Sequence, residues 1–156
     1  KMAFAGAVSG SLKFGPDTLV AQFSGGPGIG RYFLNALGTG GNGAGGYAID
    51  TAGNIQLWNV YGAHAGFTHV WAPNLRSNLV GAFSWADDVR LNGAPSTNAV
   101  QKQWLQGFVN TFVGVAKNAE IGVEFVYGEW KSFANATPEL KGHEYRVNTS
   151  FHYNLL

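Results

Sequence analysis

Apolar and polar residues alternate strictly near the end of the chain, from Glu144 to Leu155. Because strand side chains alternate with a period of two, one face of this segment is apolar or aromatic apart from Thr149, and the other is polar. The run of about twelve residues exceeds the globular average of about 5–6. It matches a tilted membrane strand of about 9–11 residues. The pattern predicts a strand that crosses a lipid bilayer.

Five further segments show the same alternation, and a sixth, residues 57–71, is also expected to be a strand. On one of them Ile121, Val123 and Phe125 share a face, opposite Glu120 and Glu124. Residues 61–71 have strand-like residue types but poor alternation, so their faces stay unassigned. The seven expected strands cover residues 2–14, 18–30, 57–71, 75–86, 101–116, 120–131 and 143–155.

The connections between these strands alternate between short and long. The short ones carry turn chemistry and are Gly15-Pro16-Asp17, Ala72-Pro73-Asn74 and Lys117-Asn118. The long ones are glycine-rich or polar and cover about 25–54, 87–100 and 132–142. Outer-membrane barrels have short periplasmic turns and longer extracellular loops. The chain is therefore predicted to be all-β, an antiparallel up-and-down transmembrane β-barrel.

Composition supports a membrane barrel. Charged residues make up 12% of the chain, about half of the usual share of roughly 25%. No apolar run approaches the roughly 20 residues of a transmembrane helix, and only helices and closed barrels satisfy every backbone group in lipid. The net charge of +1, without a basic stripe, argues against nucleic-acid binding. The absence of cysteine excludes disulfides and thiolate metal sites.

The strand count raises the question of completeness. Single-chain bacterial barrels have an even number of strands, whereas seven are expected here. Either an eighth strand lies within residues 38–57, or residues 1–156 are the C-terminal portion of one larger barrel domain. We favour the larger barrel because residue 1 already lies next to an expected strand. Open sheet edges do not persist in lipid, so other sequence would have to close the barrel.

Three segments resemble a known family. They are Trp71-Ala72-Pro73-Asn74-Leu75-Arg76-Ser77, the strand from Ala119 to Gly128, and Phe151-His152-Tyr153-Asn154. They resemble a periplasmic turn, the penultimate strand and the closing strand of proteobacterial trimeric porins of the DcaP-like group, over about the last hundred residues. The sequence departs from that pattern at Leu155 and Leu156, where such barrels usually end in an aromatic residue. The resemblance implies a 16-stranded channel that forms a homotrimer in the bacterial outer membrane.

The polar faces of the strands would line a water-filled lumen. Charges of both signs select permeating solutes by charge and size, so we expect passive diffusion of ions and small hydrophilic solutes. The resemblance suggests anionic solutes such as dicarboxylates. Alternatively, each charged residue can pair with another charged residue and only stabilise the barrel wall. Arg76 and Arg146 are the charged residues that we most expect to line the wall of the lumen. The candidate pore-lining residues are Lys13, Arg76, Lys102, Glu120, Glu124, Glu144, Arg146 and His152.

No catalytic or cofactor site is predicted. Residues 38–43 match the dinucleotide-binding glycine pattern but lack the strand and helix that it requires. His64 and His69 fall on opposite faces of a strand, as do His143 and His152, so neither pair can share a metal. Glu120 and Glu124 lie about 13 Å apart along the strand, too far for the carboxylate pair of a glycosidase.

Three other functions compete with a channel. One is a small eight-stranded structural or adhesion barrel in the outer membrane, without an open pore. Another is an outer-membrane enzyme, for which the loops show no catalytic cluster. The third is a secreted sandwich that binds sugars through its five tryptophans. The tryptophans mostly lie near strand ends, which favours membrane-interface girdles over a stacked binding cleft.

Overall fold

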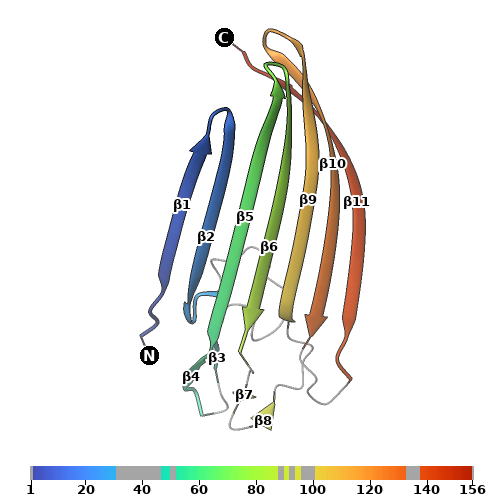
Figure 1. Cartoon of the computed structure of the whole chain (residues 1–156). Helices are drawn as coiled ribbons and strands as arrows, with labels where there is room; N and C mark the ends of the chain where they lie inside the picture. The colour runs from blue at the N-terminus through green and yellow to red at the C-terminus, as the bar shows by residue number, and fades with distance from the viewer. Residues whose placement is uncertain are drawn as a thin grey trace.

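Seven long strands form one antiparallel sheet in the computed structural model of the chain (Figure 1). The structure describes residues 2–30, 47–49, 52–87, 90–91, 94–95, 101–132 and 138–155. All seven predicted strands are confirmed, with small differences at their ends. The strands are β1 (Gly6–Phe14), β2 (Asp17–Pro27), β5 (Asn59–Ala72), β6 (Leu75–Ala86), β9 (Gln101–Ala116), β10 (Ala119–Ser132) and β11 (Lys141–Tyr153).

The strand order in the sheet is β1-β2-β5-β6-β9-β10-β11, so each long strand pairs with the long strands before and after it. Within the described residues, β1 and β11 form the two edges and the sheet is not closed. Two short hairpins lie outside it, β3 (Tyr47–Ile49) with β4 (Ile55–Leu57) and β7 (Arg90–Leu91) with β8 (Ala94–Pro95). The described part of residues 38–57 therefore adds no eighth strand to the main sheet.

The tight turns and the two short hairpins lie at opposite ends of the sheet. The tight turns at Gly15-Pro16, Pro73-Asn74 and Lys117-Asn118 lie at the upper end in Figure 1, here called the turn end. Gly15 adopts a φ of 60°, which favours glycine. The short hairpins lie at the lower end, here called the loop end. The predicted alternation of connection lengths is confirmed.

The pairing registers sort the side chains onto two faces. Large apolar side chains share one face, here called the apolar face, and most remain exposed; Leu79 is 58% and Phe151 is 65% exposed. The other face, here called the polar face, carries amides, hydroxyls and charged groups. On β5, Ala63, Ala65 and Phe67 lie on the apolar face. Small residues on both faces of β5 explain its poor sequence alternation.

The apolar face suits a lipid environment. A soluble monomer rarely exposes a continuous apolar patch of this extent, whereas lipid-facing strands of a barrel do so by design. The described residues include no helix of the length and hydropathy that a membrane span requires.

Candidate functional site

Seven of the eight candidate residues lie on the polar face. The registers place Lys13 opposite Thr18, Arg76 opposite Phe112, and Glu120 opposite His152. Glu124, Glu144 and Arg146 also lie on this face. Lys102 falls at a register shift between β9 and β10, where strand pairing does not assign its side chain to either face. The strand alternation seen in the sequence therefore identified the side of the sheet correctly for the other seven; a role in lining a pore remains a prediction.

Four residues form a cluster on the polar face near the turn end, here called the turn-end cluster: Arg76, Phe112, Glu120 and His152. The Arg76 guanidinium donates to both Glu120 carboxylate oxygens, at 2.6 and 2.8 Å. It also lies over the Phe112 ring, 4.6 Å from the centroid, a cation–π geometry. His152 Nδ1 lies 3.0 Å from the same carboxylate. Bidentate pairing fixes the guanidinium in the plane of the carboxylate, so Arg76 is compensated within the wall.

Gly122 makes room for this cluster. It lies between Phe112 of β9 and Ser150 of β11. A Cβ at this position would overlap the Phe112 ring and lie 2.7 Å from Ser150 Oγ. The glycine therefore lets the Phe112 ring approach β10 closely while it stays in contact with the Arg76 guanidinium.

A second set of polar residues forms one register row across all seven strands, here called the central row. Its members are Lys13, Thr18, Thr68, Asn78, Asn110, Glu124 and Asn148. Side-chain hydrogen bonds link five of them in series. Thr68 donates to Asn78 at 2.6 Å, and Asn78 donates to Asn110 at 2.6 Å. Asn110 donates to Glu124 at 3.1 Å, and Asn148 donates to the other Glu124 oxygen at 3.0 Å.

Glu124 accepts hydrogen bonds from both sides of the row, from Asn110 on β9 and from Asn148 on β11. Because each amide bonds a neighbour in the row, the orientation of these side chains is fixed. Sequence reasoning had singled out Lys13 and Glu124 but not the threonines and asparagines between them. Only the register brings these residues into one row, and a single sequence does not contain the register.

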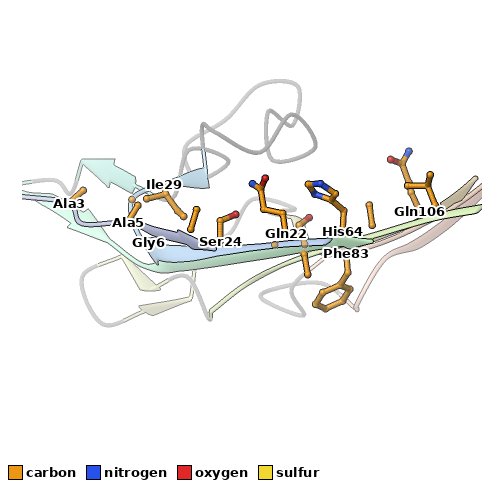
Figure 2. Close-up of a pocket in the computed structure, with 16 residues that line it drawn as sticks. Ala3, Ala5, Gly6, Gln22, Ser24, Ile29, His64, Phe83 and Gln106 are labelled. Atoms are coloured by element: carbon orange, nitrogen blue, oxygen red, sulfur yellow. The ribbon is translucent and has the colours of Figure 1, made fainter. Parts of the chain in front are cut away.

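A groove of about 1010 Å³ opens on the polar face toward the loop end. Figure 2 shows Gln22, Ser24, His64 and Gln106 on its side of the sheet, while Phe83 points to the opposite side. Small residues such as Ala82 form much of its floor. Among the described residues, its lining includes no carboxylate, lysine or arginine, so this part of the wall is polar without a side chain of permanent charge.

The other candidate charges near the loop end are loosely paired. Lys102 Nζ lies 3.9 Å from Glu139, and Arg146 Nη2 lies 3.9 Å from Glu144. The Arg146 and Glu144 side chains are about half exposed, and exposed pairs of this length contribute little free energy. These groups remain accessible to solvent and to solutes at the polar face.

The apolar face carries a polar and aromatic belt at the turn end. Asp17 accepts from the Val70 backbone N–H at 2.9 Å and contacts His69 Nδ1 at 2.7 Å. The His69 and Trp71 rings meet edge to face at 4.2 Å. Trp71 Nε1 donates to Ser77 Oγ at 3.0 Å, while the indole stays 62% exposed. An exposed, hydrogen-bonded tryptophan is typical of a membrane–water interface.

A matching aromatic belt lies at the loop end. Tyr61 stacks with Phe23 at 6.4 Å and with Trp85 at 5.3 Å. Tyr61 and Trp71 lie ten residues apart on β5, which corresponds to about 33 Å along a strand. At the usual tilt of about 40° the belts are separated by about 25 Å, the height of the apolar band of outer-membrane barrels.

The tryptophans only partly fulfil the girdle interpretation. Trp71 and Trp85 lie on the apolar face within the belts, but Trp104 and Trp130 pair in register on the polar face. Trp58 is 93% shielded from solvent, just before β5. Successive residues of a strand point to opposite faces of the sheet. Where β9 and β10 pair regularly, the even-numbered residues, including Trp104 and Trp130, point to the polar face. Tyr127 and Tyr145, 5.4 Å apart on the apolar face, extend the aromatic belt instead.

The histidines are arranged as the alternation predicts. His64 lines the groove on the polar face, whereas His69 lies on the apolar face against Asp17. His143 contacts Tyr127 on the apolar face, and His152 contacts Glu120 on the polar face. No group of three or more potential metal ligands occurs in the described part of the chain. The glycine pattern at 38–43 lies outside the described residues.

The fold is similar to a solved membrane protein. The crystal structure of the outer membrane channel DcaP of Acinetobacter baumannii superposes with a TM-score of 0.70 and 21% sequence identity, over 97% of this chain and 41% of that chain. The chain has the fold of part of an outer-membrane channel. No family model and no curated protein matches the sequence.

The structural similarity confirms the predicted fold class, an antiparallel transmembrane barrel sheet that is open in this structure. The similar protein is an outer membrane channel. The chain spans 41% of the length of that channel. The resemblance seen in the sequence is supported at the level of fold; the proteobacterial trimeric group is a finer inference.

Proposed function

We propose that the chain forms part of the wall of a porin in the bacterial outer membrane, a water-filled channel for passive diffusion of ions and small hydrophilic solutes. One observation carries this proposal. Across the seven strands of a channel-like fold, most of the large exposed apolar side chains lie on one face and most of the polar and charged side chains lie on the other. Lipid on one side of the sheet and water on the other satisfy both faces.

A single larger barrel would complete the sheet. The outer edges of β1 and β11 have no strand partner among the described residues, and unpaired edges are costly in lipid. We propose that residues 1–156 are the C-terminal portion of one barrel domain. Dividing seven strands by the matched share of 0.41 gives about 17, close to the 16 that the family resemblance implies. A homotrimer remains part of this proposal on the resemblance alone.

The wall charges bear on the solute class. Lys13 supports the expectation of anionic solutes such as dicarboxylates. Lys102 and Arg146 add weaker support, because each lies 3.9 Å from a carboxylate. Arg76 supports it less than the sequence implied, because Glu120 compensates its charge. The ion selectivity of the channel measures the balance of positive and negative charge along its wall.

Conductance across a planar lipid bilayer tests the channel proposal. The native protein, extracted in detergent, is expected to give discrete ohmic steps. Groups of three steps would support the trimer. A folded, heat-modifiable barrel that gives no steps would contradict the channel and favour the small structural barrel.

Breaking the turn-end pair is expected to shift ion selectivity. Glu120→Gln leaves the Arg76 charge uncompensated, so the ratio of chloride to potassium permeability should rise about twofold, as one added wall charge implies. The reversal potential in a KCl gradient measures this ratio. The double variant Arg76→Gln/Glu120→Gln keeps the net charge of the wall and should restore the ratio. An unchanged ratio in Glu120→Gln would show that Arg76 does not face the permeation path.

A further inference from the structure

Two candidate charges on the polar face have no ion-pair partner within the described residues, and both belong to the central row. Arg76 and His152 contact Glu120, Lys102 approaches Glu139, and Arg146 approaches Glu144. Lys13 and Glu124 make no such contact in the described ranges. They occupy β1 and β10, so one row carries an uncompensated cation toward one edge of the sheet and an uncompensated anion toward the other.

Glu124 is held in place without being neutralised. Its Oε2 accepts from Asn110 and its Oε1 accepts from Asn148, so the two neighbouring strands fix both oxygens. Asn110 is itself fixed by Asn78, which accepts from Thr68. A carboxylate offers about four lone-pair sites, and these two amides use two of them. The other two remain for a group on the polar face, where Glu124 is half-buried.

We propose that Glu124 is a specificity-determining residue of the channel and forms a binding site in the central row for a permeating cation. The cation is an alkali-metal ion or the ammonium group of a solute, since both suit a fixed carboxylate with free lone pairs. Asn110 and Asn148 are positioning residues. The inference rests on the proposed channel function, because it requires water and ions at the polar face.

The charge is sufficient for a measurable effect. A unit charge about 4 Å from a passing cation raises its occupancy about fivefold even at the dielectric constant of water. Salt screens an exposed charge beyond about 10 Å at ordinary ionic strength, so the effect is local to the row. Glu120 does not compete for the same cation, because Arg76 already occupies both of its oxygens.

Reversal potentials of the full-length protein in planar bilayers with a KCl gradient test the proposal. Glu124→Gln preserves the shape of the side chain and removes its charge; the ratio of potassium to chloride permeability should fall about two- to fivefold. Glu144→Gln is the matched control, because it removes the same charge from a carboxylate that lies outside the central row, 3.9 Å from Arg146. We expect a clearly smaller fall in the control. Equal falls, or no fall in Glu124→Gln, would overturn the proposal.

The positioning residues are tested with the Glu124 charge intact. Asn110→Ala and Asn148→Ala each remove one amide donor, and each should cause part of the fall in the permeability ratio. A ratio that stays at the wild-type value would show that these amides stabilise the sheet only. Heat-modifiability of each variant verifies that the barrel has folded.

Two additional measurements separate the outcomes. Replacing potassium with methylammonium and then with tetramethylammonium, which has no N–H donor, distinguishes ammonium recognition from simple attraction of a cation. If Glu124→Gln lowers the relative permeability of methylammonium more than that of tetramethylammonium, the site recognises ammonium groups. Equal effects on the two cations would mean that the site attracts cations in general. A wild-type barrel without conductance steps would overturn the channel function itself; conductance with unaltered selectivity in Glu124→Gln would overturn this inference alone.

Discussion

Leu79→Arg is expected to destabilise the folded barrel by about 2–4 kcal/mol in a lipid bilayer. Leu79 lies on the apolar face within β6, 58% exposed, with Phe67 and Val109 opposite it on the neighbouring strands. An arginine there would place a charge between the two aromatic belts, in the hydrocarbon layer. The free energy of unfolding, from urea titration of protein refolded into lipid vesicles, measures the loss.

Ala82→Arg on the same strand is the matched control. Ala82 lies on the polar face and lines the groove beside His64 and Gln106, so an added guanidinium would enter water. We expect a change within about 0.5 kcal/mol, the usual range for surface substitutions. If both arginines destabilised the protein equally, the assignment of the apolar face to lipid would be wrong.

Gly122→Val is expected to destabilise the protein by about 1–3 kcal/mol, the usual cost of an overpacked site. The Cβ would overlap the Phe112 ring and crowd Ser150 Oγ. The Phe112 ring would have to leave its place beneath Arg76, and the bidentate contact with Glu120 would be disturbed as well. Urea titration in vesicles measures the stability change.

Gly107→Val provides the comparison for this glycine. No heavy atom lies within 4 Å of the position of a Cβ at Gly107, and the residue lies on the apolar face opposite Gly81 and Tyr127. Valine favours strands over glycine, so stability should stay equal or rise. A loss as large as that of Gly122→Val would mean that glycine is required for strand curvature and not for the Phe112 contact.

The strands and their faces could be predicted from the sequence because they depend on local periodicity. The last strand shows this most clearly: Tyr145, Val147 and Phe151 alternate with Arg146 and His152, and the structure places the two sets on opposite faces. The β5 strand was the exception. Its alanines and glycines carry little polarity, so its faces became clear only through pairing with β2 and β6.

The contacts within the wall could not be predicted in the same way. Arg76 and Glu120 lie 44 residues apart, and Asn78 and Asn110 lie 32 apart. Their meeting depends on the register of β6, β9 and β10, and a slip of one residue would move every side chain to the other face. Alternation therefore identified Glu124 as a polar-face residue, whereas only the paired strands show that two amides hold it.

The order of the strands has a consequence for how the wall assembles. Because each long strand pairs with its neighbours along the chain, the sheet can grow hairpin by hairpin, with the tight turns at Gly15-Pro16, Pro73-Asn74 and Lys117-Asn118 closing each pair. Contacts within each hairpin close short stretches of chain and cost little loop entropy, whereas pairing one hairpin with the next closes one of the longer connections. At every stage both edges of the growing sheet expose backbone donors and acceptors, so the nascent wall needs protection along two edge strands until the barrel closes.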